Sequence, residues 1–115
     1  MRRDIAEMWV AALRSGNYKQ GLGALHEGDE FCCLGVLCEL AAHAGVVLDV
    51  QLWESGRTTY DRNWHGLPPS VQKWSGTRSM DGEYDPEEHP LSVLNDSEKS
   101  FEHIADVIEK NWERL

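Results

Sequence analysis

The strongest constraint on how this chain can fold is one segment that is apolar on nearly all sides. Residues 33–44 read CLGVLCELAAHA, and Glu39 is the only charged residue among them. Leu34, Leu37 and Ala41 recur at helical spacing, and Gly45 follows as a stop signal. Because a helix without a polar face must be covered by other elements, the sequence predicts a central buried helix near 33–44.

Two amphipathic helices are predicted near the ends of the chain. For the first, Asp4 and Glu7 have the spacing of a capping box, and Gly16 suits the residue that ends a helix. For the last, Ser100 is a suitable N-cap before an apolar stripe over residues 101–115.

The segments between these helices favour short β structure. Glycines punctuate residues 17–31, which predicts a short hairpin or an irregular strand pair. Residues 46–66 alternate and are rich in β-formers, which predicts an antiparallel hairpin that turns near 54–57. Residues 67–76 predict a short helix that starts with proline, and residues 91–94 predict a short strand or extended anchor.

The predicted fold class is α+β. A small antiparallel sheet packs with three to four helices around the central helix. A length of 115 residues fits a single domain spanning 1–115, in which residues 77–90 form a polar, acidic loop.

The net charge of −9 is concentrated in the last third of the chain. Residues 81–115 contain eleven acids and three bases. Duplex nucleic acid is therefore excluded as an expected partner, because phosphate contacts need a basic face. The acidity indicates either a solvated surface or a docking surface for a basic protein. The longest apolar stretch, near 31–48, is too short and interrupted for a membrane span, so no membrane association is expected.

The three cysteines do not form a recognisable metal or disulfide pattern. Cys32 and Cys33 are adjacent and Cys38 follows five residues later. This spacing matches no zinc motif, and an odd number of cysteines favours reduced thiols in a cytoplasm. We expect no metal and no cofactor, and we expect these thiols to fill the core.

Several blocks of the sequence occur together in an order that resembles a known group. They are Trp9-x-x-Ala12-Leu13-Arg14-Ser15-Gly16-x-Tyr18-x-Gln20, Phe31-Cys32-Cys33-Leu34-Gly35-Val36-Leu37-Cys38, Leu67-Pro68-x-x-Val71-x-x-Trp74-x-Gly76, Leu94-Asn95-Asp96 and Ser100-Phe101-x-x-Ile104-Ala105-Asp106-x-Ile108-Glu109. In this order they resemble a group of small proteins encoded by tailed phages and prophages. The resemblance spans nearly the whole chain and implies an accessory protein that works in a bacterial host cytoplasm. It brings no established activity and no functional residues.

Aromatic and basic residues gather around the predicted hairpin. The candidate binding residues are Lys19, Gln20, Trp53, Arg57, Tyr60, Arg62 and Trp64. Aromatic faces stack on planar rings and arginine binds phosphate or carboxylate in a bidentate manner, so this set could hold a nucleotide-like small molecule. In the alternative interpretation, two of the aromatic residues are core anchors and the rest lie on the surface. An exposed aromatic patch would equally fit a homodimer face.

An enzymatic alternative comes from the order of four polar residues. Cys33 at a helix start would be the nucleophile, His65 the base, Asn95 its orienter and Gln20 an oxyanion helper, as in papain-type hydrolases. The local sequence signature of that family is missing here.

The leading functional hypothesis is a non-enzymatic, phage-type accessory protein that acts by binding. It would counter host defence, either by sequestering a nucleotide-type small molecule or by blocking a host protein. A host protein would be bound by the acidic last helix and the 77–90 loop.

Overall fold

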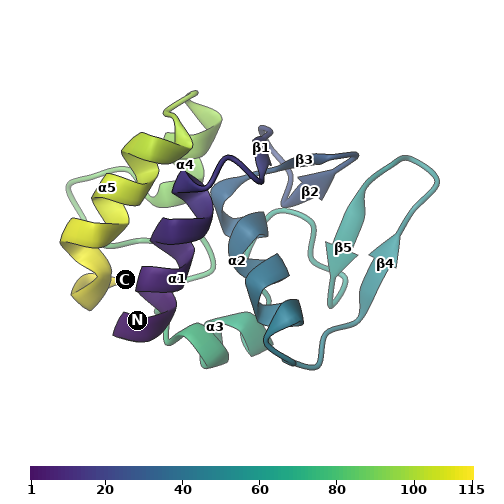
Figure 1. Ribbon diagram of the computed structural model, residues 1–115, viewed down its shortest axis with the longest axis horizontal. Coiled ribbons are helices and arrows are strands. Elements are labelled where there is room, and N and C mark those ends of the chain that lie inside the picture. Colours follow the sequence, from purple (N-terminus) through teal and green to yellow (C-terminus); the bar gives the residue numbers. More distant parts are fainter.

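Helix α2 (Cys33–His43) lies at the centre of the computed structural model, which describes residues 1–115 (Figure 1). Seven of its eleven residues are buried, and helices from both sides of it in the sequence pack against it. The prediction of a central buried helix is confirmed. The fold class is α+β, although the structure has five α-helices and divides its strands between two small sheets.

One close backbone contact fixes the position of α2. A Cβ atom on Gly35 would lie 1.7 Å from the carbonyl oxygen of Leu25, so no side chain fits there. Nearby, the amide of Cys32 donates to the same carbonyl at 3.2 Å. Gly35 therefore lets the backbone at Leu25 pass directly against the helix.

Helices α1 (Arg3–Arg14) and α5 (Phe101–Asn111) lie side by side, and α1 lies between α5 and α2 (Figure 1). Their apolar stripes enter the core, and the buried indole of Trp9 donates from Nε1 to the Cys33 carbonyl at 2.9 Å. The Ser100 cap is confirmed, because its Oγ accepts from the His103 amide at 3.1 Å.

The predicted capping box of α1 is wrong. The helix begins two residues earlier than a cap at Asp4 requires, and the N-cap residue is Arg2, whose side chain makes no capping hydrogen bond. Asp4 instead accepts from Arg2 at 2.9 Å, and Glu7 accepts from Arg3 at 3.2 Å. Asp4, in the first turn, still lies near the positive end of the helix dipole.

The first sheet contains β1 (Lys19–Gln20), β2 (His26–Glu27) and β3 (Glu30–Phe31) in the order β1-β3-β2. The β2–β3 pair is the predicted hairpin. Strand β1 pairs with β3 in parallel, which the expected antiparallel sheet did not include. The residues between β1 and β2 carry the chain to the opposite edge of the sheet, and β3 then lies between the two strands.

The second sheet is the predicted antiparallel hairpin of β4 (Val50–Leu52) and β5 (Thr58–Tyr60). Strand β5 is buried and β4 is exposed along its whole length. The hairpin therefore extends from the body of the molecule, at the end opposite to α5 (Figure 1).

Two short helices cover the remaining side of α2. Helix α3 (Pro69–Ser75) starts with proline and ends at Gly76 with φ 76°, as predicted. Helix α4 (Leu91–Asp96) replaces the strand that was expected at 91–94, so that prediction is wrong. Pro90 precedes the first turn, and Leu91 and Asn95 are both buried on one side, at helical spacing.

The acidic loop at 77–90 is held against the body of the protein. The Met80 carbonyl accepts from the Leu67 amide at 2.9 Å, and Asp85 pairs with Arg114 at 3.2 Å. A short 3-10 turn (Trp112–Arg114) follows α5. No helix in the structure combines the length and apolar character needed to cross a membrane.

The contact at Gly35 predicts a large effect of adding one methyl group. Gly35→Ala gains about 1 kcal/mol of helix propensity. Over-packing against an immobile backbone carbonyl costs about 3 kcal/mol or more, so we expect a net loss of about 2 kcal/mol in the free energy of unfolding. Urea denaturation followed by circular dichroism measures this loss.

Gly23→Ala is the matched control. Gly23 has φ 80° and open space around it, so alanine there brings only the backbone cost of about 1 kcal/mol. A Gly35→Ala protein as stable as the Gly23→Ala protein would contradict the steric account.

Candidate functional site

Three of the predicted binding residues lie together on the outer side of the β4–β5 hairpin. Arg57 Cζ lies 4.3 Å from the centroid of the Trp64 ring, a cation–π contact. Trp53 lies across the ladder from Arg57, and its amide donates to the Arg57 carbonyl at 2.9 Å. We call Trp53, Arg57 and Trp64 the hairpin face.

The hairpin face is exposed and also held in place. The side chains of Trp53 and Trp64 are 51% and 40% exposed. Trp53 Nε1 donates to Thr59 Oγ1 at 3.0 Å, and the Trp64 carbonyl accepts from the Leu25 amide at 2.7 Å. Large aromatic side chains are thus presented to solvent in fixed positions.

The Arg57 guanidinium is only partly satisfied by the chain itself. Its Nη2 atom lies 3.9 Å from Glu27 Oε1, and its buried Nε atom has no hydrogen-bond partner. Arg57 therefore keeps donor capacity next to the Trp64 ring.

Tyr60 belongs to the core and is separated from the hairpin face. Its side chain is fully buried, its hydroxyl donates to Glu39 Oε2 at 2.9 Å, and His26 Nδ1 lies 3.0 Å from the same oxygen. Burial and the neighbouring Glu39 carboxylate raise the pKa of Tyr60 far above its usual range. Tyr60 is thus one of the core anchors of the alternative interpretation.

The remaining predicted binding residues lie apart from the hairpin face. Lys19 is on the first sheet and pairs with Glu30 at 3.6 Å. Gln20 donates to Asn95 Oδ1 at 3.0 Å and to the Lys99 carbonyl at 2.8 Å. Arg62 is exposed in the turn after β5, with φ 66°.

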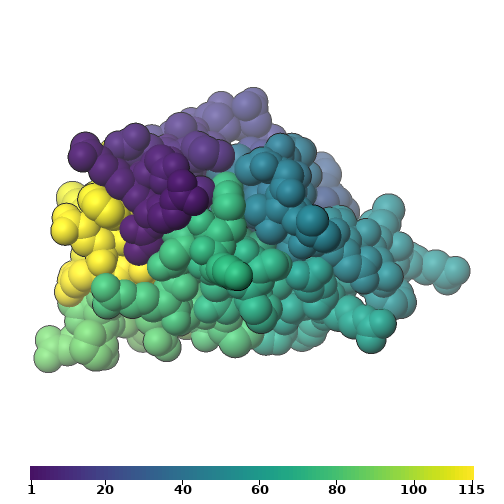
Figure 2. Space-filling model, turned by 90° about the horizontal axis from the view of Figure 1, so that it is seen from below, coloured from purple at the N-terminus to yellow at the C-terminus, as the bar shows by residue number.

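The hairpin face is not part of a hollow. All the surface hollows are lined by other segments, chiefly α1, α4, α5 and the 77–90 loop. In Figure 2 the hairpin, in teal, forms the narrow end of the molecule at the right. A small molecule would have no enclosing walls there, whereas a flat protein surface could contact all three side chains.

The structure brings together Gln20, Cys33 and Asn95 of the hydrolase hypothesis, but the contact uses the backbone amide of Cys33 and not its thiol. Asn95 Oδ1 accepts from the Cys33 amide at 3.1 Å as well as from Gln20. The Cys33 thiol is fully buried and donates to the Leu91 carbonyl at 3.6 Å, and burial raises its pKa well above the ordinary value. His65 is exposed on another segment, so it does not form the expected pair with Cys33.

His65 instead shares a hollow with Cys32. The hollow measures about 140 Å³ and is lined by Gly23, Cys32, His65, Asp81, Ser92 and Asp96. Cys32 is the N-cap residue of α2, and its Sγ accepts from the Gly35 amide at 3.4 Å. Sequence reasoning chose Cys33 as the residue at the start of the helix, and α2 does begin there, but the cysteine that shares a hollow with His65 is the N-cap residue before it.

The environment of Cys32 keeps its thiol protonated at neutral pH. Burial, partly offset by the Gly35 and Leu34 amides, raises its pKa to about 11. Thiolate is the nucleophilic form, so Cys32 is a weak nucleophile in this arrangement. The structure contains no group of three or more His, Cys, Asp or Glu residues placed to hold a metal ion.

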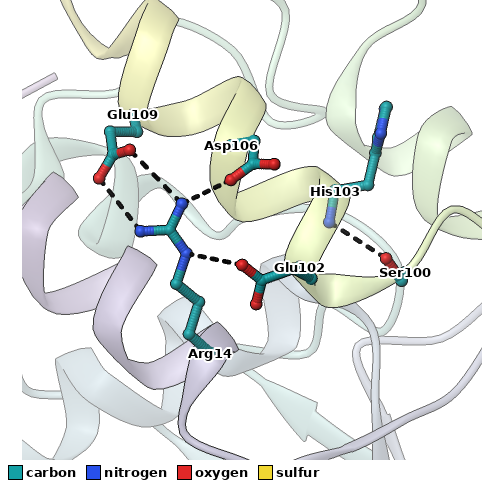
Figure 3. A network of polar contacts seen from close by, with 6 residues as sticks. All are labelled: Arg14, Ser100, Glu102, His103, Asp106 and Glu109. Atoms are coloured by element: carbon teal, nitrogen blue, oxygen red, sulfur yellow. Dashed lines mark hydrogen bonds and ion pairs between the residues drawn. The ribbon is translucent and has the colours of Figure 1, made fainter.

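The acidic stripe of α5 is largely engaged within the chain. Arg14 of α1 lies 3.3 Å from Glu102, 2.6 Å from Asp106 and 3.1 Å from Glu109 (Figure 3). The hydrogen bonds that Arg14 donates to Glu109 and Asp106 raise its pKa above its already high value. This clamp joins α1 to α5, so three of the acids proposed as a docking surface already have a basic partner.

A comparison with known protein families gives a match over nearly the whole chain. A family model described as "Domain of unknown function (DUF8296)" matches residues 1–112. No curated protein and no solved structure matches the chain.

The raised pKa of Cys32 predicts slow alkylation at neutral pH. A pKa of about 11 leaves a thiolate fraction at pH 7 about a hundredfold smaller than that of a thiol with a pKa near 9. Iodoacetamide labelling, followed by mass spectrometry, should therefore accelerate about tenfold per pH unit up to that value. Cys33 and Cys38 should react only on unfolding.

A Cys32→Ser protein and a urea-unfolded sample identify which thiol reacts. Rapid labelling of Cys32 below pH 7 that is lost in the His65→Ala protein would contradict this prediction. It would support the hydrolase hypothesis, with Cys32 as the nucleophile in place of Cys33.

Proposed function

We propose that this chain, which belongs to the DUF8296 family, acts by binding another protein through its hairpin face. The observation that carries the proposal is the exposure of two tryptophans outside any hollow: Trp53, which pairs with Arg57 across the hairpin, and Trp64, whose ring contacts the Arg57 guanidinium. The proposed activity requires no chemistry by the chain itself.

The composition and rigidity of the hairpin face support a protein partner. Tryptophan and arginine are the residue types that most often dominate the energy of protein interfaces. The contacts from Trp53 to Thr59 and from Arg57 to Trp64 fix these side chains before binding. Less conformational entropy is then lost when a partner docks.

The same geometry favours a protein over a nucleotide-like ligand. A nucleotide site needs walls that bury most of the ligand, and Tyr60, Lys19 and Gln20 are directed to other contacts. Two tryptophans around one arginine on a projecting hairpin instead suit a broad, shallow contact.

The resemblance to tailed-phage proteins suggests where the chain acts and against what kind of partner. We propose an accessory protein of phage type that acts in the bacterial cytoplasm and blocks a host protein involved in defence. Three free, buried cysteines are compatible with a reducing compartment. The partner would contact the hairpin end, because the acids of α5 already bind Arg14.

Site-specific photo-crosslinking in bacteria tests the proposed surface. A p-benzoylphenylalanine residue replacing Trp53 or Trp64 should crosslink one discrete host protein. The same residue replacing Met8, which is 42% exposed on α1, should not crosslink it. Equal crosslinking from position 8, or none from 53 and 64, would contradict the proposed surface.

Alanine variants measure the energy of the contact once that partner is purified. Trp53→Ala and Trp64→Ala should each weaken binding by about 2 kcal/mol, or roughly thirtyfold in Kd. Met8→Ala should leave Kd unchanged. Expression of the native chain, but not of Trp64→Ala, should raise phage plating on a defended host.

A thermal-shift screen with cyclic and ADP-ribose-type nucleotides separates the two kinds of ligand. No shift is expected. A stabilisation that disappears in Arg57→Ala would transfer the proposal to a nucleotide.

A further inference from the structure

Strand β4 has an unpaired edge, because its sheet contains only β4 and β5. The Asp49 carbonyl accepts from the Asp61 amide at 2.8 Å, and the Trp53 amide donates to the Arg57 carbonyl. The backbone groups of Asp49 and Trp53 therefore face the β5 side of the hairpin. Antiparallel pairing alternates, which directs Gln51 inward as well. The N–H and C=O groups of Val50 and Leu52 therefore point away from the sheet. We call these groups the β4 edge.

The side chains beside the β4 edge are apolar and accessible. Val50 is 47% exposed and Leu52 is 75% exposed, and the preceding Val47 is 92% exposed. Monomeric proteins usually protect such an edge with lysine, proline or a bulge, and β4 reads Val50-Gln51-Leu52 without any of these.

The β4 edge is complementary to itself. Val50 and Leu52 lie symmetrically on either side of Gln51. In an antiparallel pairing of two copies about a two-fold axis at Gln51, the N–H and C=O of Val50 would meet those of Leu52 in the second copy. The two Gln51 amides would meet at the axis, where each can donate and accept. Each Val50 side chain would lie beside Leu52 of the other copy.

The charge distribution also favours a second copy at this edge. Residues 46–66 contain three acids and two bases, a net charge of −1 out of −9 for the chain. In the proposed register Asp49 faces Trp53 of the second copy, so no like charges are opposed. The acidic α5 and 77–90 loop lie at the other end of an axis 37 Å long (Figure 1). The length of the molecule is several Debye lengths at physiological salt, so charges at the far end are largely screened at the β4 edge.

We infer that the chain forms a two-fold dimer by antiparallel pairing of β4 with β4 of a second copy, giving a continuous sheet in the order β5-β4-β4-β5. The inference uses the edge of the sheet, whereas the proposed function uses the hairpin face. Because the two-fold axis is perpendicular to the sheet, both hairpin faces would lie on one side. A dimeric partner could then bind both, with a gain from effective concentration.

Sedimentation equilibrium and light scattering of the full chain test the dimer. The mass should rise from 13.1 kDa toward twice that value as concentration increases through the micromolar range. Leu52→Pro removes one outward N–H per copy and leaves the β5 ladder intact, since proline is tolerated on an edge. It should weaken dimerisation about tenfold or more. Leu52→Val keeps the donor and should remain dimeric.

A second variant tests the position of the axis without a change to the backbone. Gln51→Lys places two ammonium groups face to face, so the dimer should dissociate at low salt and recover at high salt. A native chain that stays monomeric at every concentration would overturn the inference. So would a dimer that neither Leu52→Pro nor Gln51→Lys weakens. The crosslinks from positions 53 and 64 to a host protein would survive either result.

Discussion

The hydrogen bonds of one buried side chain, Asn95, connect the segments on which the rest of the structure depends. Its Oδ1 accepts from the first amide of α2 and from Gln20, and its Nδ2 donates to the Gly21 carbonyl at 2.9 Å. Helix α4 thereby fixes the start of α2 and the chain around β1. A buried amide with these partners satisfies groups that would otherwise be costly to bury. Gln20, Cys33 and Asn95, whose order in the sequence resembled that of a hydrolase, are here joined by hydrogen bonds that hold the fold together.

The molecule separates a charged end from an apolar end. At one end, Arg14 gathers three carboxylates and the 77–90 loop contributes further acids around Arg114. At the other, the hairpin exposes tryptophan, valine and leucine. The net negative charge keeps unrelated copies apart in solution, and the nearly neutral hairpin end is left for specific contacts. The proposed partner and the proposed second copy both use the end where electrostatic repulsion is weakest.

The sequence predicted the elements whose signals are local. The apolar periodicity of residues 33–44 and the cap at Ser100 are confirmed, because burial and capping act within a few residues. The helix at 91–96 was missed because the apolar residues Leu91 and Val93 are two positions apart, the spacing typical of a strand. The helical spacing of the buried pair Leu91 and Asn95 becomes visible only once the tertiary contacts of Asn95 are known. Trp53, Arg57 and Trp64 come from one short stretch of the sequence, so their clustering in the sequence could suggest that they lie near one another in the hairpin region. Side chains alternate between the two faces of β5, and Tyr60 lies on the face that enters the core. Which face that is depends on the strand register, which the sequence does not specify.

The Arg14 clamp also affects the order in which the chain can fold. Glu102, Asp106 and Glu109 are three or four residues apart on α5, and like charges at that spacing repel one another along an isolated helix. Arg14 relieves the repulsion, but it lies about ninety residues earlier in the chain. Contacts between such distant residues close large loops and form slowly. Helix α5 is therefore expected to become stable only when it docks on α1, so that folding joins the first and last helices in one cooperative step.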